Sequence, residues 1–153
     1  MNTDLSTQSA KLIRGHDLTA LDVFGACVTV LGGANETAGI FSLAKVVCLP
    51  GTGAPPHTHV ETEHFHVIRG RLTVQLGNQK LELITGDTIH IPSGAPHAFS
   101  NASGEETEFL SAATPAGHEK FFRDADGLSR SGQFNPATAA ALYELALDQR
   151  NRP

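Results

Sequence analysis

Residues 51–70 read GTGAPPHTHVETEHFHVIRG, and residues 86–101 read GDTIHIPSGAPHAFSN. His57 and His59 are two residues apart, so on an extended strand their side chains project from the same face, and Glu63 joins them by the same period-two rule. Residues 51–56, just before His57, are predicted to be irregular and rigid chain. A second stiff turn, residues 92–96, precedes His97, which is therefore expected to come from a separate strand. These stretches therefore predict four polar side chains on one wall of a β structure.

The flanking sequence also predicts β structure. Short β-rich runs alternate with turn signals, which is typical of an all-β sandwich or barrel. Helices are expected only near the C-terminus, as one or two turns over residues 116–124 and as a helix over 137–149, opened by Asn135 as N-cap and Pro136 at the first helical position. The expected strands cover residues 28–31, 40–49, 63–69, 72–76, 81–84, 88–91 and 109–113.

Size and composition indicate one globular domain. The chain has 153 residues, of which 40% are hydrophobic and 18% are charged, and the formal net charge is -5. This acidic balance, without a Lys/Arg cluster, argues against nucleic-acid binding. No apolar run approaches the length of a membrane span, so we expect no membrane partner and a cytoplasmic location. We divide the chain into a loose arm (1–15), a barrel (16–115) and a C-terminal helical extension (116–153).

The four polar side chains suit a metal ion. Imidazole and carboxylate groups bind mid-row divalent metals. Four ligands, His57, His59, Glu63 and His97, would hold an ion and leave coordination positions for water or substrate, which is typical of a reactive site. Glu63 has two possible roles: it is either a ligand throughout or, once detached, a general base toward a substrate hydroxyl.

The same residues resemble the two sequence motifs of the cupin superfamily. Both motifs match at every defined position and spacing, and the gap between them is the short one of microbial single-domain cupins. The resemblance implies a small jelly-roll barrel, also called a double-stranded β-helix, followed by a short C-terminal helical segment. It also implies one divalent Fe, Mn, Ni, Co, Cu or Zn ion per chain. The matching residues are Gly51, His57, His59, Glu63 and Gly70, then Gly86, Pro92, Gly94, His97 and Asn101.

Further segments resemble bacterial cupins described as quercetin dioxygenase-like. One departure is His66, where that group more often has tyrosine. The resemblance favours an oxidoreductase of dioxygenase type acting on a small aromatic or enol-type substrate. A metal-assisted isomerase, epimerase or lyase is the first alternative, and a non-catalytic ligand-binding cupin is the second. The segments are residues 36–41, 55–57, 96–101 and 114–122.

Other residues near the motifs are assigned by strand alternation. If Glu63 faces the metal, His64 and His66 face the other way. Phe99 shares a face with His97, so it is the first candidate for a pocket wall, followed by Phe65 and Phe41. Asn101 is expected as a supporting polar residue near the site, and a site role for His118, beyond the barrel, is not expected. A homodimer is expected because exposed sheet edges invite pairing.

Overall fold

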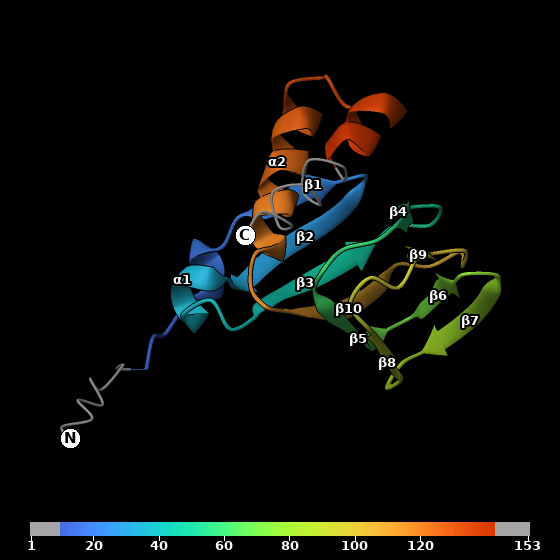
Figure 1. The fold of residues 1–153 in the computed structure, drawn as a ribbon, viewed down its shortest axis with the longest axis horizontal. Helices are drawn as coiled ribbons and strands as arrows, with labels where there is room; N and C mark the ends of the chain where they lie inside the picture. Colours follow the sequence, from blue (N-terminus) through green and yellow to red (C-terminus); the bar gives the residue numbers. More distant parts are fainter. Residues whose placement is uncertain (1–9, 143–153) are drawn as a thin grey trace.

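Two antiparallel sheets make up most of the computed structural model, which describes residues 10–142 (Figure 1). One sheet has the strand order β1-β2-β3-β10-β5-β8, and the other has the order β4-β9-β6-β7. The elements are η1 (Gly15–Asp17), β1 (Ala20–Val23), β2 (Ala26–Gly32), α1 (Ala34–Thr37), β3 (Ser42–Cys48), β4 (Gly53–His57), β5 (Thr62–Arg69), β6 (Arg71–Leu76), β7 (Gln79–Ile84), β8 (Thr88–Ile91), β9 (His97–Ser100), β10 (Thr107–Thr114) and α2 (His118–Arg130).

Each expected strand range overlaps a strand of the structure, and β1 and β4 are two strands that the sequence did not predict. β4 contains Pro55 and Pro56, which the sequence analysis took as irregular chain. Proline cannot donate a ladder hydrogen bond, so it is tolerated on a sheet edge. β4 is one of the two edge strands of its sheet, which explains why this proline-rich segment is still extended.

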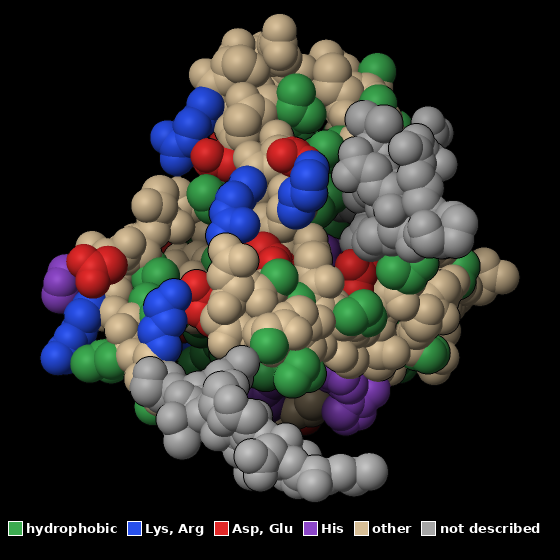
Figure 2. All heavy atoms as spheres, turned by 60° about the vertical axis from the view of Figure 1, so that its left-hand side comes forward, with side chains coloured by type: hydrophobic (Ala, Val, Ile, Leu, Met, Phe, Trp, Pro, Cys, Tyr) green, Lys and Arg blue, Asp and Glu red, His purple; other side chains and the backbone are tan. Residues whose placement is uncertain are grey.

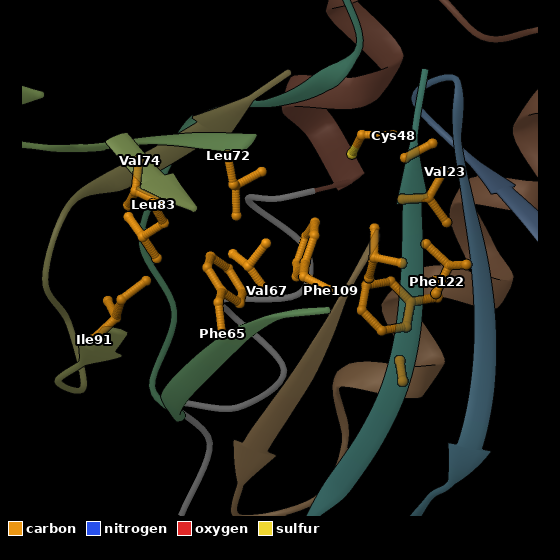
Figure 3. Packing of buried hydrophobic residues seen from close by; sticks show 14 of the residues in the cluster. Val23, Cys48, Phe65, Val67, Leu72, Val74, Leu83, Ile91, Phe109 and Phe122 are labelled. Atoms are coloured by element: carbon orange, nitrogen blue, oxygen red, sulfur yellow. The ribbon is translucent and has the colours of Figure 1, made fainter. Parts of the chain in front are cut away.

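The core lies between the two sheets and follows the period-two rule. Along β3 and β10 every second side chain is buried, and along β5 the buried residues are Glu63, Phe65 and Val67, while His64 and His66 face outward. Figure 3 shows buried side chains of both sheets meeting in this space. Phe65, Leu72 and Phe109 are at most 1% exposed. On this buried face of β5, Glu63 is thus the one polar residue beside Phe65 and Val67.

The strand arrangement fits a jelly roll, but the expected closed barrel is not observed. Among residues 10–142 no strand pairs across the two sheets, so the molecule is an open sandwich. Helix α2 covers part of the six-stranded sheet: the Asp22 backbone amide in β1 donates to Asp126 Oδ1 in α2 at 2.8 Å. Phe121, Phe122 and Ala125 of α2 are buried.

The C-terminal part is more helical than the sequence suggested. α2 runs to Arg130 rather than ending near residue 124. The predicted N-cap is confirmed, because Asn135 Oδ1 accepts from the backbone amides of Ala137 (2.9 Å) and Thr138 (3.0 Å). Helix then runs over residues 136–142, and the rest of the predicted helix, 143–149, lies outside the described residues. Residues 1–9 of the predicted arm also lie outside them, and residues 10–14 have no helix or strand.

The visible surface carries mixed charges. On the face drawn in Figure 2, Lys and Arg side chains lie beside Asp and Glu side chains, without a continuous basic patch. Within residues 10–142, none of the helices combines the length and the apolar character that crossing a membrane requires.

Candidate metal centre

The four predicted ligand residues lie together between the sheets. His57 ends β4 and pairs in register with His97 at the start of β9, while Glu63 is the second residue of β5. His59 comes from the connection between β4 and β5. The imidazole ring centroids lie 4.3 Å apart for His57 and His97, 4.8 Å for His59 and His97, and 5.6 Å for His57 and His59. We call these four residues the His/Glu centre, and their role as ligands stays a prediction.

The residues converge for a reason that the sequence argument missed. β4 ends at His57, so His57 and His59 do not share one strand face. The pairing of β4 with β9 shifts in register between Ala54 and His57, after which the chain leaves the sheet. The backbone amide of Gly94 then donates to His59 O at 2.8 Å. This hydrogen bond ties the segment that carries His59 to the turn that precedes His97.

The three imidazoles share one hydrogen-bonding pattern. Each Nδ1 lies within hydrogen-bond distance of a backbone carbonyl two residues away: His57 to Pro55 O at 2.7 Å, His59 to Glu61 O at 3.1 Å, and His97 to Ala95 O at 2.9 Å. A carbonyl can only accept, so each Nδ1 carries the proton. In the neutral ring, Nε2 is then the atom with the free lone pair. Such outer hydrogen bonds are what orient metal-ligating histidines.

The Nε2 lone pairs meet the Glu63 carboxylate. Glu63 Oε2 lies 3.1 Å from His59 Nε2 and 3.2 Å from His97 Nε2. Two acceptors at this distance repel each other unless a cation, either a proton or a metal ion, lies between them. Nitrogen and carboxylate donors in this arrangement suit a divalent transition metal. The residues of the His/Glu centre therefore fit the ion that the sequence motifs imply.

Electrostatics support the same assignment. Burial, together with the neighbouring His97, lowers the pKa of His57 to about 3. Burial is the largest single influence on the pKa of His97 and would lower it. The hydrogen bonds with Glu63 and the Ala95 carbonyl, together with the charge of Glu63, outweigh burial and raise this pKa. Burial would raise the pKa of Glu63, yet the nearby His118, His59 and His97 hold it well below its usual range. At neutral pH the centre thus holds a neutral His57 and an ionised Glu63, the forms that bind metals.

His118 is a residue of the site that the sequence analysis missed. It begins α2, is 6% exposed, and places Nδ1 3.8 Å from Glu63 Oε1. Its ring stacks on Phe122 with centroids 5.1 Å apart, and it meets the His59 ring at 4.7 Å. Two groups of three residues each bring their ligand atoms within 4.8 Å of one another: His57, His59 and His97, and His59, Glu63 and His118. No motif spacing links His118 to the others, so only the packing of α2 reveals it.

Two further polar groups steady the centre. Ser111 Oγ, on β10, donates to Glu63 Oε1 at 2.8 Å, which leaves Oε2 directed at the imidazoles. Glu61 is 1% exposed, and its Oε2 lies 3.4 Å from His59 Nδ1. A carboxylate behind a ligating histidine strengthens that ligand. A lone glutamate between two motif positions gave no signal of this role in the sequence.

A small cavity adjoins the centre. The walls of this inner cavity include His57, Glu63, His118, Phe65 and Phe99, and its volume is about 30 Å³, enough for one or two water molecules. The rings of Phe65, Phe99 and Phe109 meet edge to face with centroids 5.0 to 5.4 Å apart. Phe65 and Phe99 thus lie on the wall of this cavity, and their role in a substrate pocket stays a prediction.

Two other residues that the sequence places at or near the pocket, Phe41 and Asn101, do not line the inner cavity. Phe41 is 41% exposed and does not line the inner cavity, because it precedes β3 rather than lying within it. Asn101 is fully buried but points into the β9–β10 connection. Its Nδ2 donates to Cys48 O (2.9 Å) and Glu105 O (2.6 Å), and its Oδ1 accepts from the amide of Ser103 (3.0 Å). Asn101 therefore holds a turn together.

Comparison with known proteins points to one family. Residues 44–113 match the family described as Cupin domain. The quercetin 2,3-dioxygenase of Bacillus subtilis is 33% identical over 79 residues, which are 50% of this chain and 23% of that protein. An uncharacterized protein of Methanocaldococcus jannaschii, MJ1618, is 32% identical over 75 residues, 48% of this chain and 60% of that one. The match thus spans less than two thirds of either relative.

Solved structures agree on the fold. The polyketide cyclase RemF from Streptomyces resistomycificus superposes with a TM-score of 0.61 and 25% sequence identity. The superposition covers 69% of this chain and 80% of that one. Two proteins with different named activities, a dioxygenase and a cyclase, therefore resemble parts of this chain.

Proposed function

Because the chain belongs to the cupin superfamily, we propose that it is a metal-dependent oxidoreductase of dioxygenase type. The substrate is a small aromatic or enol-type molecule. His57, His59, Glu63 and His97 hold one divalent metal ion, and the inner cavity beside them receives the reacting end of the substrate.

One observation carries this proposal: the Nδ1 atoms of three histidines are held by carbonyls, and two of their Nε2 atoms meet the Glu63 carboxylate. Three imidazoles and one carboxylate leave coordination positions for substrate and oxygen. When bound, a redox-active ion would supply the one-electron chemistry that brings O2 and an electron-rich substrate together.

The protein itself contributes positioning and a dry environment. Ser111 and the imidazoles hold the two oxygens of Glu63, which favours the ligand role of this carboxylate over that of a mobile base. The aromatic walls Phe65 and Phe99 keep water from the reacting atoms. The likeness to the B. subtilis quercetin 2,3-dioxygenase supports this reaction class for the matched half of the chain.

A second candidate is a metal-assisted reaction without redox change, such as an isomerisation, epimerisation or lyase step. The specific observation in its favour is His118, since Nδ1 lies 3.8 Å from Glu63 Oε1 at the inner cavity. An imidazole beside a carboxylate can move a proton on a substrate whose oxygen a metal polarises. The resemblance to a polyketide cyclase supports the same candidate.

The first experiment is elemental analysis of protein purified without chelator, with His57→Ala and His64→Ala as matched variants. We expect near-stoichiometric metal in the wild type and His64→Ala, and its loss in His57→Ala. Oxygen uptake is then screened with phenols, flavonols and 1,3-diketones after loading with Fe, Mn, Ni, Co, Cu or Zn. Oxygen uptake with redox-active ions and none with zinc would support the oxidoreductase.

Turnover under strict anaerobiosis would favour the second candidate. Ligand binding without any turnover would indicate a non-catalytic ligand-binding protein.

The homodimer and the cytoplasmic location stay predictions. Size-exclusion chromatography with light scattering tests the first, because a monomer of 16.2 kDa and its dimer are well separated in mass.

A further inference from the structure

The turn between β1 and β2 holds Phe24 in a left-handed backbone conformation, which is unusual for phenylalanine. Val23 and Ala26 pair across it, so Phe24 and Gly25 form a two-residue hairpin turn, with φ of 57° and 83°. Positive φ at both positions corresponds to a type I′ turn, in which Asn or Asp followed by Gly is preferred. A phenylalanine in the left-handed region is strained. Strain of this kind persists where surrounding structure enforces it, and it clusters at functional sites.

Tertiary contacts hold the Phe24 ring in place. Its centroid lies 5.8 Å from that of Phe121 in α2 and 5.1 Å from that of Phe134, which follows α2. Phe24 also lines the inner cavity beside the His/Glu centre. The strained turn therefore puts an aromatic ring at the side of the proposed metal site.

The Phe24 ring also lines a second and larger hollow. This outer groove has a volume of about 710 Å³, within the usual range for small-molecule sites, whereas the inner cavity has about 30 Å³. Among the described residues, Phe24 and His57 are the two that line both spaces. The outer groove and the inner cavity therefore meet at these two side chains, one of which belongs to the His/Glu centre.

The groove has an apolar and uncharged wall. Proline, phenylalanine and alanine side chains dominate it, including Pro55, Pro96, Phe134 and Ala139, and no Asp, Glu, Lys or Arg is among its described residues. Such a wall fits a neutral, flat, apolar molecule better than a sugar phosphate or an organic acid. The inner cavity is too small for an organic ring, so a substrate must place most of its body elsewhere.

We propose that the outer groove binds the neutral apolar body of the substrate while its oxygen-donor end reaches the His/Glu centre past Phe24, whose ring decides which molecules enter. This inference rests on the proposed function, because it assumes an ion at the centre. The occupant is a small organic molecule with a planar apolar part at one end and metal-binding oxygens at the other. Phe24 is thus a specificity-determining residue and not a ligand.

The test uses Co²⁺-loaded protein, because Co²⁺ absorption in the visible range reports on its ligands. Acetohydroxamate and 2-naphthohydroxamate are the probes: they share one donor group and differ in a flat apolar body. We expect the naphthyl compound to bind the wild type at least about tenfold more tightly. Phe134→Ser should remove most of this preference. Ile84→Ser changes a 51% exposed apolar residue on β7, away from the groove, and should leave the preference intact.

Phe24→Asn tests whether the Phe24 ring controls entry. Asparagine suits the first position of a type I′ turn, so this variant should keep the hairpin and lose the ring. Stopped-flow measurement should show the naphthyl probe associating about tenfold faster with this variant than with the wild type. In the wild type the probe must first separate the Phe24 ring from Phe121 and Phe134, and the variant lacks these contacts. Thermal unfolding of all three variants checks that they fold.

The outcomes separate the two proposals. If the wild type takes up no Co²⁺, the proposed function fails. If Co²⁺ binds but the two probes bind equally well, with no effect of Phe134→Ser, the groove proposal is overturned and the metal centre stands. If Phe24→Asn folds and the naphthyl probe binds it no faster than it binds the wild type, Phe24 does not control entry to the His/Glu centre.

Discussion

Acid should destabilise the metal-free protein through His57. Burial holds the pKa of this residue at about 3, against an ordinary value of 6.5. The folded pKa is depressed, so below about pH 6.5 the unfolded chain binds a proton at His57 that the folded chain does not. The free energy of unfolding therefore falls as the pH drops from about 6.5 toward 3, and the loss is complete below about pH 3.

The expected magnitude follows from these two values. Proton binding at one group stabilises each state by RT ln(1 + 10^(pKa − pH)), with the unfolded-state pKa for the unfolded chain and the folded-state pKa for the folded chain. The difference between the two states grows by about 2 kcal/mol from about pH 7 to about pH 5, and the free energy of unfolding falls by the same amount. The result hardly changes if the folded pKa is a unit higher, because at pH 5 the folded His57 is still mostly neutral. For a chain of 153 residues this corresponds to a melting temperature lower by roughly 4–8 °C.

The assay compares the wild type with His57→Gln, both stripped of metal with a chelator, in urea titrations at each pH. The chain has no tryptophan, so far-UV circular dichroism is the suitable signal. The wild type should lose about 2 kcal/mol more than the variant between pH 7 and pH 5, and the difference between the two proteins should stay constant above about pH 7.5. Parallel loss in both proteins over the acid range would refute the idea that the fold holds His57 neutral.

Three other predictions concern the centre and its supports. His97→Ala should lose most of the bound metal while the outward-facing His64→Ala keeps it, as measured by elemental analysis; equal loss would contradict the facing that alternation assigns. Asn101→Ala should lower the free energy of unfolding by about 2–4 kcal/mol in urea titrations, because buried carbonyls lose their donor; a change below about 0.5 kcal/mol would show that the turn does not depend on this amide. Gly53→Ala places a Cβ 2.1 Å from Phe99 O, so it should force β4 from β9 and weaken metal binding, and unchanged affinity would mean that the edge strand can shift freely.

The strand pattern was accessible from sequence because alternation reports burial directly. The runs that became β3, β5, β6 and β10 alternate between buried and more exposed residues, and turn residues mark their ends. β4 was not recognised because its two prolines argue against a strand. Proline lacks a backbone N–H donor, but an edge strand does not need that donor on its open side. The length of α2 was underestimated because its stability comes from Phe121 and Phe122 packing on the sheet, which no local signal reports.

The candidate site divides in the same way. The motif spacing identified His57, His59, Glu63 and His97, yet the reasoning that one strand carries the first two was wrong, since a register shift ends β4 at His57. Phe41 does not line the inner cavity, because a residue just before a strand does not follow its alternation. Membership of the motif also did not define the role of Asn101, which its hydrogen bonds assign to a turn.

The sequence by itself determined the β-rich architecture and the four donors of the proposed metal site, because periodicity and fixed spacing are local properties of the chain. Tertiary structure alone decided the surroundings of that site. It brought His118 of α2 beside Glu63, buried Glu61 behind His59, and placed the strained Phe24 on the walls of both the inner cavity and the outer groove. These contacts join segments far apart in the chain, and packing energies that depend on the whole fold select them.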